Sequence, residues 1–255
     1  MSQAFLPAVV ILAATTTSAA FLLWLFQASP LRGALRHGQS VNNAVLSVVA
    51  VMFALLSAFM ASEVWQRRAQ ALAAVEAEAG ALRGLLRVAN AVGAPGAGLH
   101  AAARDHARVV IEQDWPALAA GRPADRSAAS TQRLYDLALG DPALLALPAT
   151  AQALLRDSLT QLRAARTQRL RLGAAHIAWG NWAALGLLAF LAQTAVATIH
   201  VAAPRSMLLA MALFTAAVTV LLSMLALNDE PFFGFAAVTD APYHKVLADF
   251  PARGG

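Results

Sequence analysis

Four long stretches of this chain contain no Asp, Glu, Lys or Arg. They are Met1–Leu31, His37–Ser62, Leu172–Pro204 and Ser206–Asn228. About 20 apolar residues in a helix cross the hydrocarbon core of a bilayer, so each stretch is long enough to span a membrane once. The pattern predicts an all-α integral membrane protein with four transmembrane helices. These helices are expected at residues 5–27, 42–65, 175–199 and 206–228.

The second charge-free stretch continues into a polar segment without a helix breaker. Between Val41 and Val92 there is no proline, and the two glycines, Gly80 and Gly84, come late. A single helix over this range would be about 75 Å long at about 1.5 Å per residue. It would leave the bilayer near Trp65, where an aromatic side chain suits the interface.

The segment between the second and third predicted spans carries helix and turn signals. The glycine-rich "GAPGAG" at 93–98 is expected to end the long helix. Asp125 or Ser127 can cap a later helix, and Asp141 precedes a proline that suits the first helical turn. Further helices are expected over 99–119 and from about 150, and no sheet is expected. The predicted parts are a first membrane half at 1–65, an inserted helical domain at 66–171, a second membrane half at 172–228, and a post-span turn and tail at 229–255.

The composition agrees with a membrane protein. Only 13% of the residues are charged and 59% are apolar, whereas soluble domains carry about 25% charged residues. The chain has no cysteine, which excludes disulfides, thiolate metal sites and cysteine catalysis. Its net charge of +5 does not indicate nucleic-acid binding, because the arginines gather beside the spans.

The distribution of arginines also predicts the orientation. Near its two membrane exits, the central segment carries Arg67, Arg68, Arg83, Arg163, Arg166, Arg169 and Arg171. The short loops on the other side contribute Arg32, Arg36 and Arg205. Since lysine and arginine accumulate on the cytoplasmic side of a membrane, the inserted helical domain and both termini are expected in the cytoplasm.

Residues of the kinds that act in catalysis form no recognisable motif in this sequence. The six histidines include no pair at the i, i+4 spacing that binds zinc, and His100 and His106 are expected on a solvated helix. Glu76 and Glu78 point to different faces of a helix, which does not suit an acid–base pair. We therefore expect no enzyme activity, no catalytic or metal-binding residue and no cofactor.

One face of the second predicted span consists of small residues. At 3.6 residues per turn, this face carries Asn43, Ser47, Ala50, Ala54, Ala58 and Ala61, and bulky apolar side chains cover the rest. Two interpretations are open. Small residues let neighbouring helices approach closely. Alternatively, copies of this helix surround a pore with a hydrophobic constriction, and Asn42 or Asn43 lies at its mouth.

The third and fourth predicted spans contain hydroxyl and amide side chains. These are Gln193, Thr194, Thr198, Thr215, Thr219 and Ser223. We expect them to form hydrogen bonds with backbone carbonyls or with neighbouring helices, as such groups usually do in membranes, rather than to line an ion path.

A helix stop, "NDEPFFG" at 228–234, follows the fourth span. Pro231 lacks a backbone donor and disfavours helix at Glu230. Phe232 and Phe233 can pack back against the protein at the membrane interface, and Gly234 permits a turn. Asp229 and Glu230 are expected to face cytoplasmic arginines, with Arg67, Arg68 and Arg171 as the candidates. This post-span turn is either a structural clamp or a clamp that is coupled to a gate.

The post-span turn resembles the Asn-Pro-Phe-Gly turn that follows the last membrane helix of bestrophin channels. Three other features are similar to the bacterial bestrophin-like family: the long helix through "EVWQRRAQALAAVEAEAGALRGLLR", the acid-Trp-Pro of "IEQDWPALAAGRP" and the basic "RTQRLRL" before the third span. The resemblance implies a bacterial inner-membrane protein whose second spans line an axial ion pore in a homo-oligomer. It favours a pentamer and an anion.

Two departures from the bestrophin pattern change these expectations. Bestrophins follow their Pro-Phe-Gly with a run of acids that forms a calcium clasp, whereas here Asp240 is the only acid in the six residues after Gly234, "FAAVTD", and Phe233 is an extra residue. Calcium gating is therefore not expected. The bestrophin neck is lined by bulky apolar residues, but the corresponding face here is mostly alanine, which leaves the pore width and the ion open.

Together the residues and the resemblance predict a homo-oligomeric ion channel whose axial pore is lined by the second transmembrane helix. The alternative is a non-conducting membrane scaffold or sensor whose cytoplasmic helices bind a partner. The expected partners are the lipid bilayer, further copies of the same chain and permeating ions, without nucleic acid.

Overall fold

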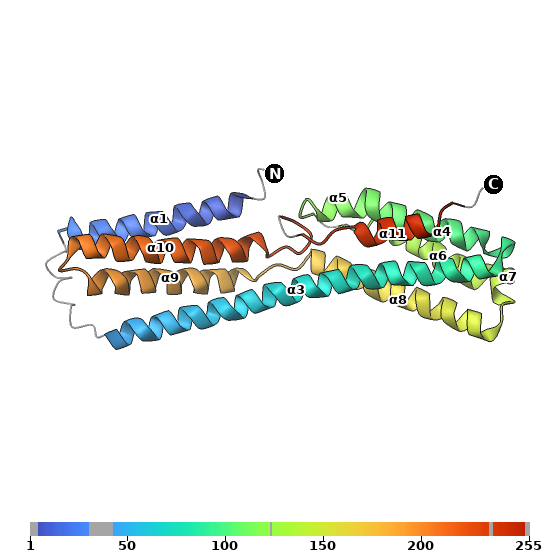
Figure 1. Ribbon diagram of the computed structural model, residues 1–255, viewed down its shortest axis with the longest axis horizontal. Helices are drawn as coiled ribbons and strands as arrows, with labels where there is room; N and C mark the ends of the chain where they lie inside the picture. The colour runs from blue at the N-terminus through green and yellow to red at the C-terminus, as the bar shows by residue number, and fades with distance from the viewer. Residues whose placement is uncertain (1–4, 31–42, 123, 235–236, 253–255) are drawn as a thin grey trace. The chain divides into compact units, whose positions relative to one another are not determined.

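A computed structural model describes residues 5–30, 43–122, 124–234 and 237–252 of the chain. The described residues form helices and no strand, which confirms the predicted all-α class. They divide into two compact units. The membrane unit comprises Met1–Trp65 and His176–Asp229, and the central unit comprises Gln66–Ala175 and Glu230–Gly255. Figure 1 gives the labels of the helices.

Four helices are long and apolar enough to cross a membrane. They are α1 (Leu6–Gln27), α3 (Asn43–Val92), α9 (Trp179–Ile199) and α10 (Pro204–Leu227). These helices confirm the four transmembrane spans that the charge-free stretches predict. The prediction of a continuous second helix is also confirmed, because α3 is a single helix of 50 residues. It ends before Gly93, whose φ of 76° favours glycine.

In the membrane unit, α1 and α10 lie side by side and α9 packs against both (Figure 1). Leu22 and Phe26, near the end of α1, are buried in the same apolar cluster as Met207 and Met211, near the start of α10. The two helices are therefore antiparallel. A second apolar cluster joins the membrane part of α3 to α9 and α10.

Polar side chains of α9 and α10 form the hydrogen bonds that the sequence predicts. Gln193 Nε2 on α9 donates to Thr215 Oγ1 on α10 at 3.1 Å. The hydroxyl of Thr219 lies 2.6 Å from a threonine hydroxyl on α1. Thr194 and Thr198 donate to carbonyls four residues earlier in α9. These five side chains bond to the backbone or to neighbouring helices, which confirms the predicted role for each of them.

The central unit contains the remainder of α3 and several shorter helices. Their bounds are η3 (Ala94–Gly96), α4 (Ala97–Val109), η4 (Val110–Asp114), α5 (Trp115–Leu118), α6 (Ala128–Gly140), α7 (Pro142–Leu145), α8 (Ala149–Gly173) and α11 (Ala241–Asp249). Apolar side chains at helical spacing on α3, such as Val75, Leu82 and Leu85, are buried in the core of this unit. Asp141 caps α7 as predicted, because its Oδ1 accepts a hydrogen bond from Ala143 N at 2.9 Å.

Pro116 accounts for a change of helix geometry after α4. The sequence predicts one helix over 99–119, whereas α4 passes into the π-helix η4 and then into α5. Trp115 N bonds to Val110 O, five residues earlier. We attribute this to Pro116, which has no backbone donor and whose ring crowds the carbonyl of Glu112. In the resulting wide turn, Asp114 is fully buried in the central unit.

Candidate functional site

The membrane part of α3 has one buried face, and the rest of its surface is exposed or partly buried. Phe53, Met60 and Val64 are buried and belong to the apolar cluster with α9 and α10. The predicted small face lies about a quarter of a turn away from them. On this face Ser47, Ala54 and Ala58 are exposed, and Ala50 and Ala61 are partly buried. Asn43 is the first residue of α3, but its side chain, like the whole of Asn42, lies outside the described part of the chain.

Within its own chain α3 therefore packs through Phe53, Met60 and Val64, whereas the bulky side chains of Leu55 and Phe59 are exposed. Ser57 also lies on the buried face, and its hydroxyl donates to Phe53 O at 2.7 Å, so it brings no unsatisfied polar group into the cluster. Close approach of helices within one chain does not account for Ala54 and Ala58, because both are exposed. Such a face is available to a pore, to lipid or to a second copy of the chain.

The post-span turn begins where α10 ends. Asn228 Nδ2 donates to Met224 O at 2.7 Å and satisfies a carbonyl in the last turn of α10. Asp229 Oδ1 accepts a hydrogen bond from Ile177 N at 2.9 Å, just before α9 begins. Asp229 thus ties the end of the fourth span to the start of the third, within the membrane unit.

The rest of the post-span turn belongs to the central unit. Phe232 is buried and contacts Trp115 edge to face, with ring centroids 5.6 Å apart. Pro231 O accepts a hydrogen bond from Val238 N at 2.8 Å. Gly234 has a φ of 96°, which few residues other than glycine adopt. The predicted packing of Phe232 against the protein and the predicted turn at Gly234 are confirmed, whereas the packing of Phe233 and the position at the membrane interface stay predictions.

Glu230 approaches the backbone of Gly121, which has a φ of 64°. A Cβ atom at position 121 would lie 2.9 Å from Glu230 Oε2, so a side chain there would displace the carboxylate. The expected pairing of Asp229 and Glu230 with Arg67, Arg68 or Arg171 stays a prediction.

Five buried polar side chains from five different elements meet inside the central unit, and we call them the Glu78 cluster. The members are Glu78 of α3, His106 of α4, Asp114 of η4, Arg169 of α8 and Tyr243 of α11. Arg169 Nε donates to Glu78 Oε2 at 2.7 Å, and its Nη2 donates to Asp114 Oδ2 at 3.1 Å. Tyr243 OH donates to Glu78 Oε2 at 2.9 Å, and His106 Nε2 lies 3.4 Å from Glu78 Oε1.

Glu78 and Arg169 stabilise each other's charged forms, which burial alone would disfavour. Burial alone would raise the pKa of Glu78, but the positive charge of Arg169 and the hydrogen bonds from His106 and Arg169 lower it to about 2. Burial would lower the pKa of Arg169, and the Glu78 carboxylate raises it above its ordinary value. Burial, followed by the charge of Glu78, raises the pKa of Tyr243. At neutral pH the cluster thus contains an ionised carboxylate, a guanidinium and a neutral phenol.

Asp114 connects the Glu78 cluster to the start of α6. Its Oδ2 accepts from Ser127 Oγ at 2.6 Å, and its Oδ1 accepts from Arg126 N at 2.7 Å. Ser127 occupies the N-cap position of α6, as predicted, but its side chain makes no capping bond. The prediction of a Ser127 side-chain cap is wrong, because this hydroxyl donates to a buried carboxylate instead.

The expectation that His100 and His106 lie on a solvated helix is also wrong. Both are buried, because they share the inner face of α4 with Leu99 and Ala103. His106 Nδ1 lies 2.8 Å from Ser130 Oγ, which gives the buried ring a second polar contact. The prediction that Glu76 and Glu78 point to different faces is confirmed, since the Glu76 side chain is 53% exposed and that of Glu78 is fully buried.

The Glu78 cluster was not predicted from the sequence, although two features of the sequence point to buried acids. Glu78 falls at helical spacing between Val75 and Leu82, on the stripe that faces the core. Asp114 is the acid of the acid-Trp-Pro feature. Within the described ranges, no three His, Cys, Asp or Glu side chains come together in a way that could hold a metal ion.

The four apolar helices and the inserted helical unit define an all-α, four-span membrane protein. A family model described as the Bestrophin-like domain matches residues 11–243. The chain belongs to the bestrophin-like family, which confirms the resemblance found in the sequence.

Solved structures with similar folds agree with this family. One variant of a bacterial Bestrophin homologue from Klebsiella pneumoniae has 14% identity and a TM-score of 0.62, with 95% of this chain and 93% of that chain covered. A second variant has 16% identity and a TM-score of 0.59, with 97% of each chain covered. A structure described as a membrane protein has 16% identity and a TM-score of 0.59, with 98% of each chain covered. The comparison with curated proteins gave no match.

Proposed function

We propose that this protein is a homo-oligomeric ion channel of the bacterial inner membrane, with an axial pore lined by the small face of α3. The observation that carries the proposal is the small, uncharged face of α3, on which Ser47, Ala54 and Ala58 are exposed and take no part in the buried cluster with α9 and α10. In a closed symmetric ring each copy presents the same face to the axis. The central unit and both termini would lie in the cytoplasm, where the arginine distribution predicts them.

The proposed pore wall is apolar over most of its length. From Ser47 to Ala61 the helix rises about 21 Å, and apart from Ser47 the face consists of alanines. A narrow apolar wall controls conduction by wetting and dewetting. This face has no charged side chain, so the proposed pore wall contains no ring of charges that could select the ion. The family resemblance favours an anion and a pentamer.

In this proposal the post-span turn and the Glu78 cluster are a structural clamp. Trp115 contacts both Phe232 of the turn and Tyr243 of α11, with ring centroids 5.6 and 5.9 Å apart. Tyr243 in turn bonds to Glu78. These contacts hold the C-terminal part of the chain to the helical core of the central unit.

A non-conducting scaffold or sensor is the second candidate. It is favoured by exposed leucines of the central unit, where Leu139, Leu145 and Leu154 lie on α6, α7 and α8. Leu139 and Leu145 line the same groove, and exposed apolar surface of this kind is a feature of protein-binding sites where it is contiguous. In that case the spans would anchor the chain, and the central unit would bind a partner protein.

Planar bilayers with purified full-length protein distinguish the two functions. A channel gives unitary currents whose reversal potential shifts under a salt gradient in the direction that identifies the sign of the ion. Ala54→Phe should abolish the current, because the rings of all copies meet at the axis. Leu55→Phe, the matched control at the next position, should conserve it and change packing by about 1–3 kcal/mol or less. If the wild-type protein gives no current at any voltage or pH, the non-conducting scaffold or sensor would be favoured.

A further inference from the structure

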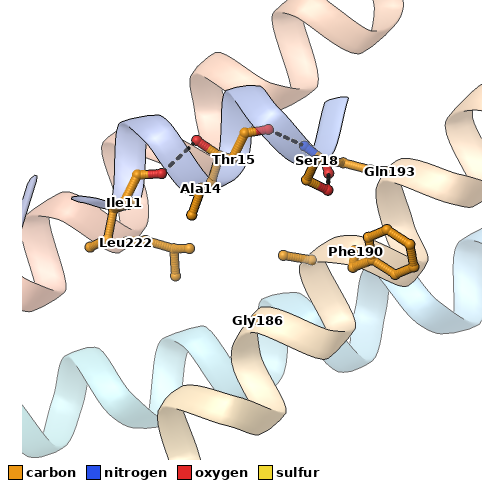
Figure 2. A pocket seen from close by; sticks show the side chains of 9 residues that line it. Ile11, Ala14, Thr15, Ser18, Gly186, Phe190, Gln193 and Leu222 are labelled. Carbon is orange, nitrogen blue, oxygen red and sulfur yellow. Dashed lines mark hydrogen bonds between the residues drawn. The ribbon is translucent and has the colours of Figure 1, made fainter. Parts of the chain in front are cut away.

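A pocket between α1 and α9 of the membrane unit is left unfilled by the side chains that the structure describes. Its volume is about 140 Å³, and Figure 2 shows it between Ile11, Ala14 and Ser18 of α1 and Gly186 and Phe190 of α9. The lining residues Ile11 to Ser18 and Gly186 to Gln193 lie in the middle turns of their spans. The pocket is therefore at the level of the hydrocarbon core of a bilayer.

The polar side chains around the pocket already have partners. Ser18 Oγ donates to Gln193 Oε1 at 2.6 Å (Figure 2). Gln193 Nε2 donates to Thr215 Oγ1 at 3.1 Å and approaches Thr15 O at 3.4 Å. Thr15 Oγ1 donates to Ile11 O at 2.9 Å. Because a buried water needs two to four polar partners, this pocket offers an apolar surface and does not suit water.

Gly186 leaves its part of the pocket open. Glycine in a membrane helix usually allows a second backbone to approach, but a Cβ atom at Gly186 would meet nothing within 4 Å. Gly186 is exposed, so the pocket is open on this side. Apolar surface without neighbouring atoms lacks their dispersion energy, so an apolar group that enters the pocket gains contacts with its lining.

We propose that this pocket binds the end of a phospholipid acyl chain. The lining is continuous with the exposed apolar surface of the spans, where Leu12 and Leu187 lie next to it in sequence on α1 and α9. Hydrocarbon chains are the molecules that surround a span at this depth. The bound chain lies beside Gln193, whose bonds connect α1, α9 and α10, so it packs against the contact that joins these three helices. The site does not depend on whether the protein conducts ions.

Photo-crosslinking in liposomes tests the site. Purified full-length protein is reconstituted with a phospholipid that carries a diazirine at the end of one acyl chain, illuminated, and mapped by mass spectrometry. We expect enriched labelling of the segments 11–18 and 186–193. Gly186→Leu, which fills the pocket, should reduce labelling of the 11–18 segment several-fold. Gly180→Leu is the matched control on the same helix, because a Cβ atom there also meets nothing within 4 Å, and it should leave that labelling unchanged.

Other outcomes would overturn the proposal. Equal labelling of the 11–18 segment in both variants would mean that the pocket holds no acyl chain. The same is true if a lipid with its diazirine in the headgroup labels the pocket equally well. Cross-links from the pocket to a second copy of the chain, without lipid adducts, would assign this face to a subunit contact. Size-exclusion elution and circular dichroism of the two variants show whether either substitution disturbs folding, and lost labelling in a folded Gly186→Leu variant supports the site.

Discussion

Arg169 and Glu78 form a fully buried ion pair, in which Nε and Nη2 of the guanidinium donate to the two carboxylate oxygens at 2.7 and 3.2 Å. The pair joins α8 to α3 across 91 positions of the sequence. Removal of Glu78 leaves the buried guanidinium of Arg169 with only the single contact to Asp114, and such a loss is more costly than the loss of an exposed pair. The stability of the central unit should therefore depend on both residues.

Glu78→Gln should destabilise the central unit by about 3–5 kcal/mol, because Arg169 would lose its main counter-charge. Thermal unfolding of the purified protein, followed by circular dichroism in detergent, measures the loss. Glu76→Gln is the matched control, since Glu76 is half-exposed and lies 4.0 Å from Arg83; it should change the unfolding temperature little. Equal losses in the two variants would show that the buried pair does not control stability.

The Glu78 carboxylate also predicts an acid-sensitive component of stability. Its pKa is lowered from 4.5 to about 2 in the folded protein, so folding favours the deprotonated form. The stabilisation is complete above the ordinary carboxyl pKa and is lost as the pH falls from about 4.5 towards 2. The unfolding temperature of the wild type should fall more steeply over this range than that of Glu78→Gln. Parallel curves would contradict the assignment.

Gly234→Ala should destabilise the post-span turn by about 1–2 kcal/mol, because alanine is strained at a positive φ. The φ of Gly234 is 96°. Gly140→Ala is the control: Gly140 ends α6, has no positive φ, and a Cβ atom there meets nothing within 4 Å. That substitution should be neutral or slightly stabilising. Thermal unfolding and limited proteolysis at the turn measure the difference: Gly234→Ala should unfold at a lower temperature and be cleaved faster than Gly140→Ala.

Reporter fusions test the orientation in the membrane. Reporters placed after Arg126 and at the C-terminus should both give cytoplasmic signals, because the arginines of the central segment lie beside the spans. A periplasmic signal from either fusion would contradict the four-span arrangement with the central unit inside. A reporter in the loop at Ala202, between α9 and α10, is the control and should be periplasmic.

The helices of this protein were predictable because their signals are local. Uninterrupted apolar runs, the absence of proline from α3 and the glycines after Val92 specify where the spans lie and where α3 ends. The π-helix at η4 was not predicted, although Pro116 was visible. A proline commonly ends or kinks a helix, and the sequence does not show that tertiary packing holds this one in a wider turn.

The Glu78 cluster was less predictable because its partners are distant in sequence. His106 and Asp114 lie 28 and 55 positions from the residues they contact in the cluster, Glu78 and Arg169. Spacing within one helix identifies a charged residue on an apolar stripe, but it does not identify the counter-charge. The small face of α3 was likewise recognised from its periodicity within one helix. Which bulky residues of α3 pack against other helices, such as Phe53 and Met60, and which are exposed, such as Leu55 and Phe59, is seen only in the structure.

Accessibility of single cysteines on α3 tests the proposed pore most directly. The chain has no native cysteine, so Ser47→Cys, Ala54→Cys, Leu55→Cys and Phe59→Cys can be compared in the same bilayer assay. A charged, water-soluble thiol reagent should label Ser47→Cys and Ala54→Cys and reduce their currents, while Leu55→Cys and Phe59→Cys stay unlabelled. Labelling at Leu55→Cys or Phe59→Cys, but not at Ser47→Cys or Ala54→Cys, would contradict a pore lined by the small face of α3.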